Sequence, residues 1–208
     1  GRIVFDFFRE NSLIVYAGVS GDFDFNGSEM IGVYQSLDNG QTWERMSNDD
    51  EPSHYASQGW YDMAIAVDPD DAATVLNAGL DIYRTNNGGV SWSQRSWWWH
   101  SFGEPTFSHA DHHELVFHPV NPDEVWAVND GGVFASYDNG GTWNEKNIGY
   151  NTYQYYAMGN ATLDTLLAYG GTQDNGTSEY DGDGDWDMVF GGDGGYCVVD
   201  YTNDDVVY

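Results

Sequence analysis

The sequence has little positive charge and almost no cysteine. Only 6 of its 208 residues are Lys or Arg, against 34 Asp or Glu, so the formal net charge is −28. Nucleic acids and anionic membranes need clustered cations, so neither is an expected partner. The single cysteine, Cys197, cannot form an intrachain disulfide, and in the run GYCVVDY it is expected to be a small buried apolar residue.

Long apolar runs and helical periodicity are also missing. The sequence has no run of 18 apolar residues and no signal-peptide pattern, so membrane insertion is not expected, although an export signal could precede Gly1. Aromatic residues make up 16% of the chain, which is enough for a packed core despite the acidity. Short runs rich in Val, Ile, Tyr and Trp, bounded by Gly, Asn and Asp, predict an almost entirely β structure.

One eight-residue pattern, called the octet below, occurs three times. It reads SLDNGQTW at 36–43, TNNGGVSW at 85–92 and SYDNGGTW at 136–143, about 50 residues apart. The same four short strand-like segments surround each copy, a fourth unit has a degenerate octet, and a fifth is cut off. Four-stranded units of this size are typical of propeller blades. The predicted fold is all-β: a β-propeller of about four blades plus a partial fifth, part of a larger ring, with blades at 1–47, 60–96, 112–147, 152–190 and 195–208.

Each octet is expected to close a hairpin between the third and fourth strands of its blade. The carboxylate accepts hydrogen bonds from turn N–H groups, glycine adopts positive φ, and the closing Trp buries its ring while its N–H finds a partner. One carboxylate per repeat at a turn indicates an architectural role rather than a catalytic one. The structural residues predicted in this way are Ser36, Asp38, Gly40, Trp43, Trp92, Ser136, Asp138, Gly140 and Trp143.

The octet resembles the Asp-box, S-x-D-x-G-x-T-W, of the BNR repeat. This repeat is found in sialidases, sortilin-type receptors, xyloglucan-cleaving endoglucanases and many secreted bacterial propellers. A wider stretch, from HADHHELVFHP through SYDNGGTW to GGTQDNGT and GGDGG, resembles the secreted bacterial sortilin-like BNR group and covers about half the chain. The resemblance implies a secreted propeller whose Asp-boxes lie on the face opposite the ligand-binding face.

Strand alternation sorts the remaining loops. If the octets join third and fourth strands, the first-to-second turns share their side, and the second-to-third turns and blade crossovers gather on the opposite rim. Long loops on a rigid scaffold are common binding sites. The loops assigned to that rim are 21–29, 48–60, 96–112, 129–132, 172–176 and 191–195.

The run WWWH at 97–100 is the strongest functional signal on that rim. Three consecutive Trp cannot all face inward from a crossover, and exposed indoles bind sugar rings or cationic groups, although packing between blades is the alternative. Trp60 and Tyr61 extend the same surface. The predicted ligand-binding residues are Trp60, Trp97, Trp98, Trp99, His100, His112, Gln173 and Asn175.

Two acidic stretches predict possible calcium sites. In GDFDFNGSE, Asp22, Asp24 and Asn26 alternate before Gly27, like the first half of a calcium loop, with Glu29 close by. Asp181, Asp183 and Asp185 have the same two-residue spacing, with Asp187 following, but lie in the degenerate fourth octet. Plain solvated turns are the alternative for both, and no organic cofactor is expected.

The cluster HADHHE would bind a transition metal only if three ligands converge. His112 and His113 point to opposite faces of a strand, so the favoured interpretation is that Asp111 and His112 form hydrogen bonds to crossover loops. A sialidase is not expected, because Arg2, Arg45, Arg84 and Arg95 do not match an arginine triad.

Two functions of different classes remain, with a structural surface-layer role as a third. The first is a secreted or cell-surface, non-catalytic propeller that binds a polysaccharide or an extracellular protein, alongside the remaining blades or domains of its parent chain. The second is a glycoside hydrolase of the xyloglucan-cleaving type, which needs two carboxylates across a cleft. The candidates for that pair are Asp111, Asp130, Asp174 and Asp193.

Overall fold

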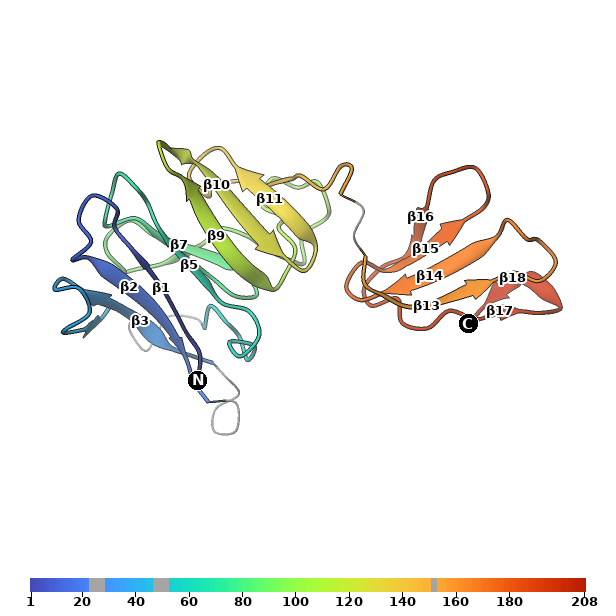
Figure 1. Ribbon diagram of the computed structural model, residues 1–208, viewed down its shortest axis with the longest axis horizontal. Helices are drawn as coiled ribbons and strands as arrows, with labels where there is room; N and C mark the ends of the chain where they lie inside the picture. The colour runs from blue at the N-terminus through green and yellow to red at the C-terminus, as the bar shows by residue number, and fades with distance from the viewer. Residues whose placement is uncertain (23–28, 47–52, 151–152) are drawn as a thin grey trace. The chain divides into compact units, whose positions relative to one another are not determined.

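The computed structural model describes residues 1–22, 29–46, 53–150 and 153–208. They form two compact units, Gly1–Ile148 (unit 1) and Gly149–Tyr208 (unit 2), and each is described by itself. Regular structure in the described residues is entirely β-strand (Figure 1). No helix in these ranges is long and apolar enough to cross a membrane.

Unit 1 contains three antiparallel sheets, each made of four consecutive strands. The first comprises β1 (Ile3–Phe7), β2 (Val15–Ser20), β3 (Met30–Ser36) and β4 (Glu44–Arg45). The second comprises β5 (Ala64–Val67), β6 (Val75–Ala78), β7 (Ile82–Thr85) and β8 (Ser93–Gln94). The third comprises β9 (His112–His118), β10 (Asn121–Asn129), β11 (Gly132–Ser136) and β12 (Asn144–Glu145).

Unit 2 contains one complete sheet and one hairpin. The sheet comprises β13 (Tyr155–Asn160), β14 (Ala168–Thr172), β15 (Thr177–Tyr180) and β16 (Asp187–Phe190). The hairpin comprises β17 (Val199–Asp200) and β18 (Asn203–Val207). Cys197 precedes this hairpin and is buried, as predicted.

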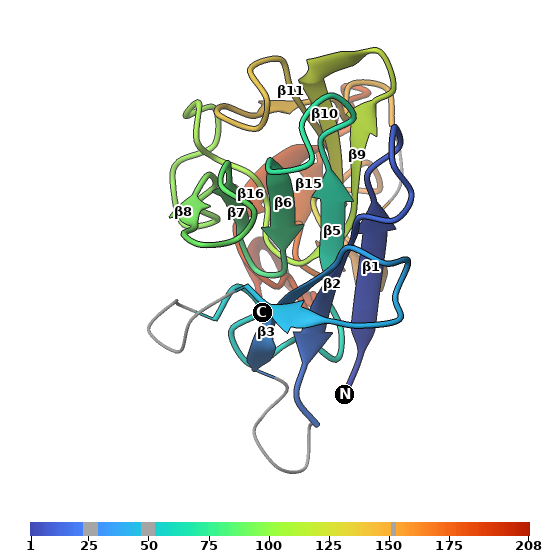
Figure 2. The same ribbon diagram turned by 90° about the vertical axis from the view of Figure 1, so that its left-hand side faces the viewer.

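The second sheet is the centre of unit 1, because both of its faces are covered. Its first strand, AIAV, is fully buried. Ile65 and Val67 pack with Tyr16 and Val33 of the first sheet, while Ala64 and Ala66 pack against the third sheet. Strands β1 and β9 both contact β5, and Figure 2 shows the three side by side. The first strands of successive sheets therefore stack as in a propeller, which confirms the predicted fold class.

The octets close the hairpins between third and fourth strands, and the first-to-second turns lie on their side. Backbone hydrogen bonds join the first two octets to the first-to-second turn of their own sheet, Asn39 N to Leu13 O at 3.0 Å and Gly88 N to Ala73 O at 2.8 Å. In the third sheet Asn139 N bonds Asp123 O, near the start of β10, at 2.8 Å. We call this side of unit 1 the octet rim and the opposite side, with the second-to-third turns and the crossovers, the crossover rim.

The same repeat position is exposed in the first sheet and buried in the other two. Phe7, Val67 and Phe117 occupy equivalent places in the strand register, yet they are 47%, 4% and 3% exposed. The second and third octets also pack on the preceding sheet, through Trp92 and Trp143, and Trp143 is only 3% exposed. Trp43 of the first octet is 43% exposed. The first sheet thus has an uncovered face.

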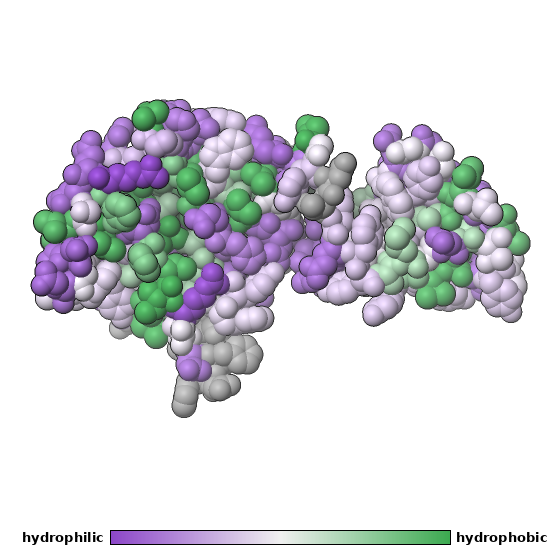
Figure 3. Space-filling model, viewed as in Figure 1, coloured by the Kyte–Doolittle hydropathy of each residue, from purple (hydrophilic) through white to green (hydrophobic). Residues whose placement is uncertain are grey.

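This face forms an apolar groove of about 420 Å³, lined mainly by Ile3, Phe5, Phe7, Val15 and Trp43. Apolar side chains are visible over the part of unit 1 where β1 runs (Figure 3). None of the described residues of unit 1 forms a sheet over them, whereas the equivalent face of the second and third sheets is covered by the sheet before it.

Two details of the octet prediction are wrong. Trp43 does not bury its ring, because no sheet precedes its own within unit 1. The N–H of Trp143 has no hydrogen-bond partner among the described residues, whereas Trp43 and Trp92 donate to Gly40 O and Gly89 O at 3.1 and 3.2 Å. Burial against a neighbouring sheet and a bond to the local turn are therefore separate features of the octet.

Candidate functional site on the crossover rim

The octet carboxylates are occupied by their own turns. Asp138 accepts hydrogen bonds from Thr142 N at 2.7 Å, Thr142 Oγ1 at 2.9 Å and Ser136 Oγ at 2.8 Å, and Asp38 has the same set from Thr42 and Ser36. The Thr42 hydroxyl and N–H, with the Ser36 hydroxyl, lower the pKa of Asp38 to about 2. At Asp138 burial raises the pKa, but the N–H and hydroxyl of Thr142 and the hydroxyl of Ser136 outweigh it, so the pKa is still lowered. These carboxylates are permanent anions that hold turns together.

His112 ties the third sheet to the second-to-third turn of the second sheet. Its N–H and its ring Nδ1 both bond Gly79 O, at 2.9 and 2.8 Å. A carbonyl only accepts, so Nδ1 carries the proton and Nε2 accepts from Ser108 Oγ at 3.1 Å. Burial lowers the pKa of His112 to about 4. Predicted as a ligand contact, His112 is instead a neutral, fully buried crossover residue with no ring nitrogen facing solvent.

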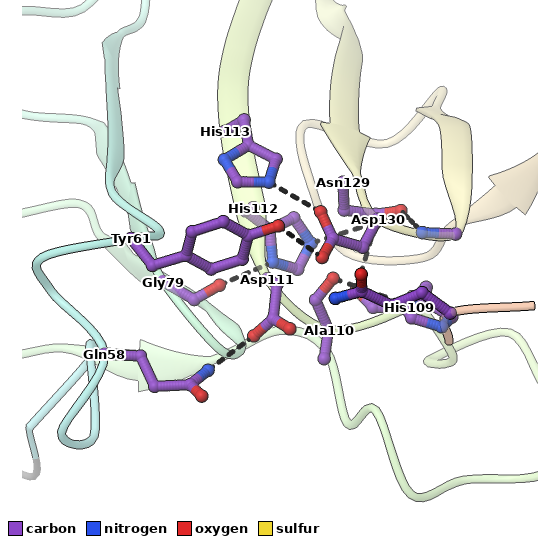
Figure 4. A network of polar contacts seen from close by, with 12 residues as sticks. Gln58, Tyr61, Gly79, His109, Ala110, Asp111, His112, His113, Asn129 and Asp130 are labelled. Atoms are coloured by element: carbon purple, nitrogen blue, oxygen red, sulfur yellow. Dashed lines mark hydrogen bonds and ion pairs between the residues drawn. The ribbon is translucent and has the colours of Figure 1, made fainter. Parts of the chain in front are cut away.

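Asp130 receives two hydrogen bonds from different sheets (Figure 4). Tyr61, from the crossover before β5, donates its hydroxyl to Oδ2 at 2.7 Å, and His113 Nε2, on β9, contacts Oδ1 at 2.6 Å. The rings of Tyr61 and His113 meet edge to face at 4.9 Å, and exposed Trp60 lies 5.5 Å from Tyr61. An aromatic surface and a carboxylate are thereby placed side by side.

Asp111 lies beside this group in a strained backbone conformation. Its φ is 64°, a region that Asp tolerates better than most residues, and its Oδ1 accepts a hydrogen bond from Gln58 Nε2 at 2.7 Å (Figure 4). Burial and the nearby charge of Asp130 raise the pKa of Asp111. The carboxylate is half-buried, and its orientation is fixed by a side chain from another sheet.

Asp62 is fully buried next to Asp111. Among the described residues, neither of its carboxyl oxygens has a hydrogen-bond partner. Burial, followed by the charge of Asp111, raises the pKa of Asp62 to about 8. This shift favours the neutral form of Asp62, because burial costs an ionised carboxylate its hydration.

The tryptophan run occupies an outer part of the crossover rim. Trp97 is half-buried and stacks on His100, with ring centroids 5.2 Å apart, while Trp98 and Trp99 are exposed and meet edge to face at 6.0 Å. Buried Asp81 accepts hydrogen bonds from Trp98 N at 2.9 Å and Ser96 Oγ at 3.1 Å, which fixes the start of the run.

The remaining candidates lie in unit 2. Asp193 accepts a hydrogen bond from Asp174 N at 3.0 Å, and Asp174 has a φ of 62°. Gln173 and Asn175 flank Asp174 in the β14–β15 turn, where Asn175 Nδ2 donates to Gln173 O at 3.2 Å. Two of the four predicted carboxylates, Asp111 and Asp130, thus lie in unit 1 and the other two in unit 2.

The predicted metal ligands do not gather in the residues that the structure describes, where no three His, Cys, Asp or Glu side chains are grouped to hold an ion. Asp24 and Asn26 lie outside the described residues, and Asp22 and Glu29 lie at the borders of that gap. Asp181 and Asp183 instead accept the N–H groups of Asp183 and Asp185, at 3.2 and 3.0 Å, as ordinary turn residues do.

Sequence reasoning missed Gln58 and Asp62. Asp62 stands in the apolar run YDMAIAV and has the same repeat position as His112, which a comparison of blades would have marked as a buried polar place. Gln58 gave no signal in the sequence, because it stands 53 residues before Asp111 and meets it only in the folded chain.

Comparison with known proteins supports the fold alone. No protein-family profile and no curated protein matches the sequence significantly. Among solved structures, the GH74 xyloglucanase from Xanthomonas campestris is 16% identical with a TM-score of 0.51, and the GH74 enzyme of Niastella koreensis is 13% identical with a TM-score of 0.50. Each alignment covers 98% of this chain but only 34% and 43% of those proteins, so the chain spans less than half of their length.

Proposed function

We propose that this chain is part of a secreted or cell-surface propeller that binds a polysaccharide on the crossover rim of unit 1 without cleaving it. The ligand would contact exposed Trp60 and the ring of Tyr61, and its hydroxyl groups would donate to Asp111 and Asp130. Trp98 and Trp99 offer a second aromatic surface on the same rim. The resemblance of the octets to Asp-boxes and of the chain to sortilin-like BNR propellers supports this proposal.

The observation that carries the proposal is the contrast between aspartates at the two rims. Asp38 and Asp138 each accept three hydrogen bonds within their own turn and offer little to a ligand. Asp111 is half-buried beside an aromatic pair, and Gln58 Nε2 donates a hydrogen bond to its Oδ1. Carboxylates beside aromatic rings are a common arrangement for sugar recognition, because the ring stacks on the sugar while the carboxylate accepts from its hydroxyls.

The test is a binding assay with a panel of soluble neutral, acidic and amino polysaccharides, including xyloglucan, measured by affinity electrophoresis and calorimetry. We expect retention of at least one polysaccharide, and a loss of about tenfold or more in affinity for Trp60→Ala and Asp111→Asn. Trp186→Ala, which changes an exposed Trp in unit 2, is the matched control and should bind normally. Equal weakening by the control, or no binding to any member of the panel, would contradict the proposal.

Glycoside hydrolysis is the second candidate, and the position of Asp111 and Asp130 on the same rim favours it (Figure 4). Glycosidases use a pair of carboxyl groups, one as acid and the other as nucleophile or base. The same panel is assayed for release of reducing ends. Release that disappears in Asp111→Asn or Asp174→Asn would replace the binding proposal by this one, whereas retention without release supports binding.

We also propose that the uncovered face of the first sheet is a contact for another blade of the parent chain. The equivalent faces of the second and third sheets are covered by a blade, and the exposed residues of β1 are as apolar as their buried counterparts. A parent chain should protect Phe5 and Phe7 from oxidative footprinting, while unit 1 alone should not. Equal labelling in both would contradict this contact.

A further inference from the structure

We infer that the seam between the second and third sheets of unit 1 holds a binding site for a small oxyanion, a sulfate or a carboxylate, formed by Arg84 and Arg95. These are two of only 6 Lys and Arg residues in a chain with 34 Asp and Glu residues. They are separate from the residues of the proposed polysaccharide surface, so the oxyanion site stands whether or not that surface binds a polysaccharide.

The strand register places both arginines on one face of the second sheet. Arg84 on β7 lies opposite Ser93 on β8. Arg95 N donates to Ile82 O at 2.7 Å, which continues this ladder by two residues. Arg84 and Arg95 are therefore diagonal neighbours across two strands, and such neighbours are about 7–8 Å apart, a distance that long side chains can span.

This face of the second sheet packs against the third sheet. Ile82 lies opposite Arg95 and belongs to the apolar cluster that the two sheets share. Leu76, opposite Arg84, belongs to the same cluster. Arg84 Nη1 also donates to Asn139 O, in the third octet, at 2.9 Å. The two arginines are half-buried and lie where the second sheet meets the third octet.

Several N–H donors in this seam have no acceptor. Nε of Arg84 and Nε of Arg95 are buried and form no hydrogen bond with the described residues, and the same holds for Nε1 of Trp143. Neither guanidinium forms an ion pair with a carboxylate in this part of the chain. Buried donors are normally satisfied, and a buried charge without a partner is the costliest case. An acceptor from outside the chain would remove that cost.

The two guanidinium charges also affect each other. Burial, and then the charge of Arg95, lower the pKa of Arg84. The carboxylates of Asp68, Asp138 and Asp71 oppose this shift from a distance, and all three already accept hydrogen bonds from turn N–H groups. An oxyanion with two oxygens can accept from both guanidiniums at once, so it would replace their repulsion by a shared attraction.

The experiment titrates the protein with sodium sulfate and with sodium acetate at an ionic strength held constant with sodium chloride. Sulfate and acetate present the two candidate groups without a polymer. The arginine Nε–H signals are followed by ¹H–¹⁵N NMR. We expect the signals of Arg84 and Arg95 to shift saturably with at least one probe, with half-saturation on the order of 1–10 mM. The signal of Arg9, which is exposed in the β1–β2 turn, should not shift.

Arg95→Gln is the test variant, and Arg9→Gln is its matched control, because each removes one positive charge. Arg95→Gln should weaken the response of Arg84 by about tenfold or more, since one of the two charged donors is lost. Arg9→Gln should leave that response unchanged. The gain in melting temperature when sulfate replaces chloride at equal ionic strength should also be larger in the control than in Arg95→Gln.

A response to only one of the two probes supports the site and identifies the group that it takes. Wild-type signals of Arg84 and Arg95 that change with neither probe would overturn the inference and leave the pair a packing role. Equal shifts for Arg9 and the two seam arginines would also overturn it, as would equal responses of Arg95→Gln and Arg9→Gln, because both results would mean general screening of charge.

Discussion

Unit 1 keeps two kinds of aspartate at opposite ends of its strands. On the octet rim, Asp38 and Asp138 are surrounded by donors from their own turns, and their pKa values are lowered. On the crossover rim, burial raises the pKa of Asp62 and of Asp111, and the nearby charge of Asp111 adds to the first shift and that of Asp130 to the second. Residues close in sequence can supply the hydrogen-bond donors for a carboxylate in a turn. Carboxyl groups that only the fold brings together lack such local donors, so their protonated forms are favoured. The first kind supports the architecture, and the second is suited to binding or chemistry.

The largest expected effect concerns the two octet tryptophans. Trp143→Ala removes a ring buried against the second sheet and should lower the free energy of unfolding of unit 1 by about 3–5 kcal/mol. Trp43→Ala removes a ring that is 43% exposed and should cost less than about 1 kcal/mol. Urea denaturation followed by circular dichroism measures both. Similar losses would mean that octet tryptophans act within their own turn rather than against the preceding sheet.

The octet carboxylates should behave alike despite their different burial. Asp138→Ala and Asp38→Ala each remove the acceptor of three hydrogen bonds, so each should lower the free energy of unfolding, and by similar amounts. The same denaturation experiment checks this. A large difference between them would show that the bonds are not the main contribution of the octet.

Asp81 and Asp62, two buried aspartates of the second blade, should respond in opposite ways to the same substitution. Asp81 accepts hydrogen bonds from Ser96, Trp98 N and Gln94, so Asp81→Asn should lower the melting temperature. Asp62 accepts none, so Asp62→Asn should raise it at pH 8 by several degrees. Differential scanning calorimetry of the two variants and the wild type measures these melting temperatures. A lower melting temperature for Asp62→Asn at pH 8 would contradict the account of Asp62.

The pH dependence of stability should show buried groups of the crossover rim acting in opposite directions. Asp62 has a raised pKa, so its contribution falls as the pH rises from about 4 to about 8. Burial lowers the pKa of His54 to about 3 and that of His112 to about 4, so their contribution falls as the pH drops below 6.5. Each slope approaches about 1.4 kcal/mol per pH unit.

Asp62→Asn removes one of these opposing slopes. The variant should lose stability more steeply than the wild type between pH 6.5 and 5, and less steeply between pH 6.5 and 8. Urea midpoints across this range provide the measurement. Parallel curves for the two proteins would show that Asp62 does not change its protonation on unfolding.

The smallest expected effect is that of chelation. Calcium at Asp22, Asp24, Asn26 and Glu29 remains a prediction from the sequence, as does calcium at 181–187. If ions screen the acidic chain, EDTA at low ionic strength should lower the melting temperature by a few degrees, and added salt should restore it. An unchanged melting curve would remove calcium from the description of this protein.

The sequence predicted what depends on local pattern. The octets, their donors and the division of loops between two rims follow from strand alternation and turn chemistry, and the structure confirms them for Asp38 and Asp138. The sequence could not predict the exposure of Trp43, because that exposure depends on whether another sheet covers the ring. Asp62 and Gln58 were missed because a buried acid and an amide acquire their roles only where segments distant in sequence meet.

The most direct test measures stability and polysaccharide affinity together for Asp138→Ala and Asp111→Asn. Asp111→Asn should keep the melting temperature of the wild type, because Asn tolerates the same φ, while its affinity falls about tenfold or more. Asp138→Ala should melt at a lower temperature and, while folded, bind as the wild type does. Loss of affinity in folded Asp138→Ala with full affinity in Asp111→Asn would place the binding surface on the octet rim and contradict the separation of roles described here.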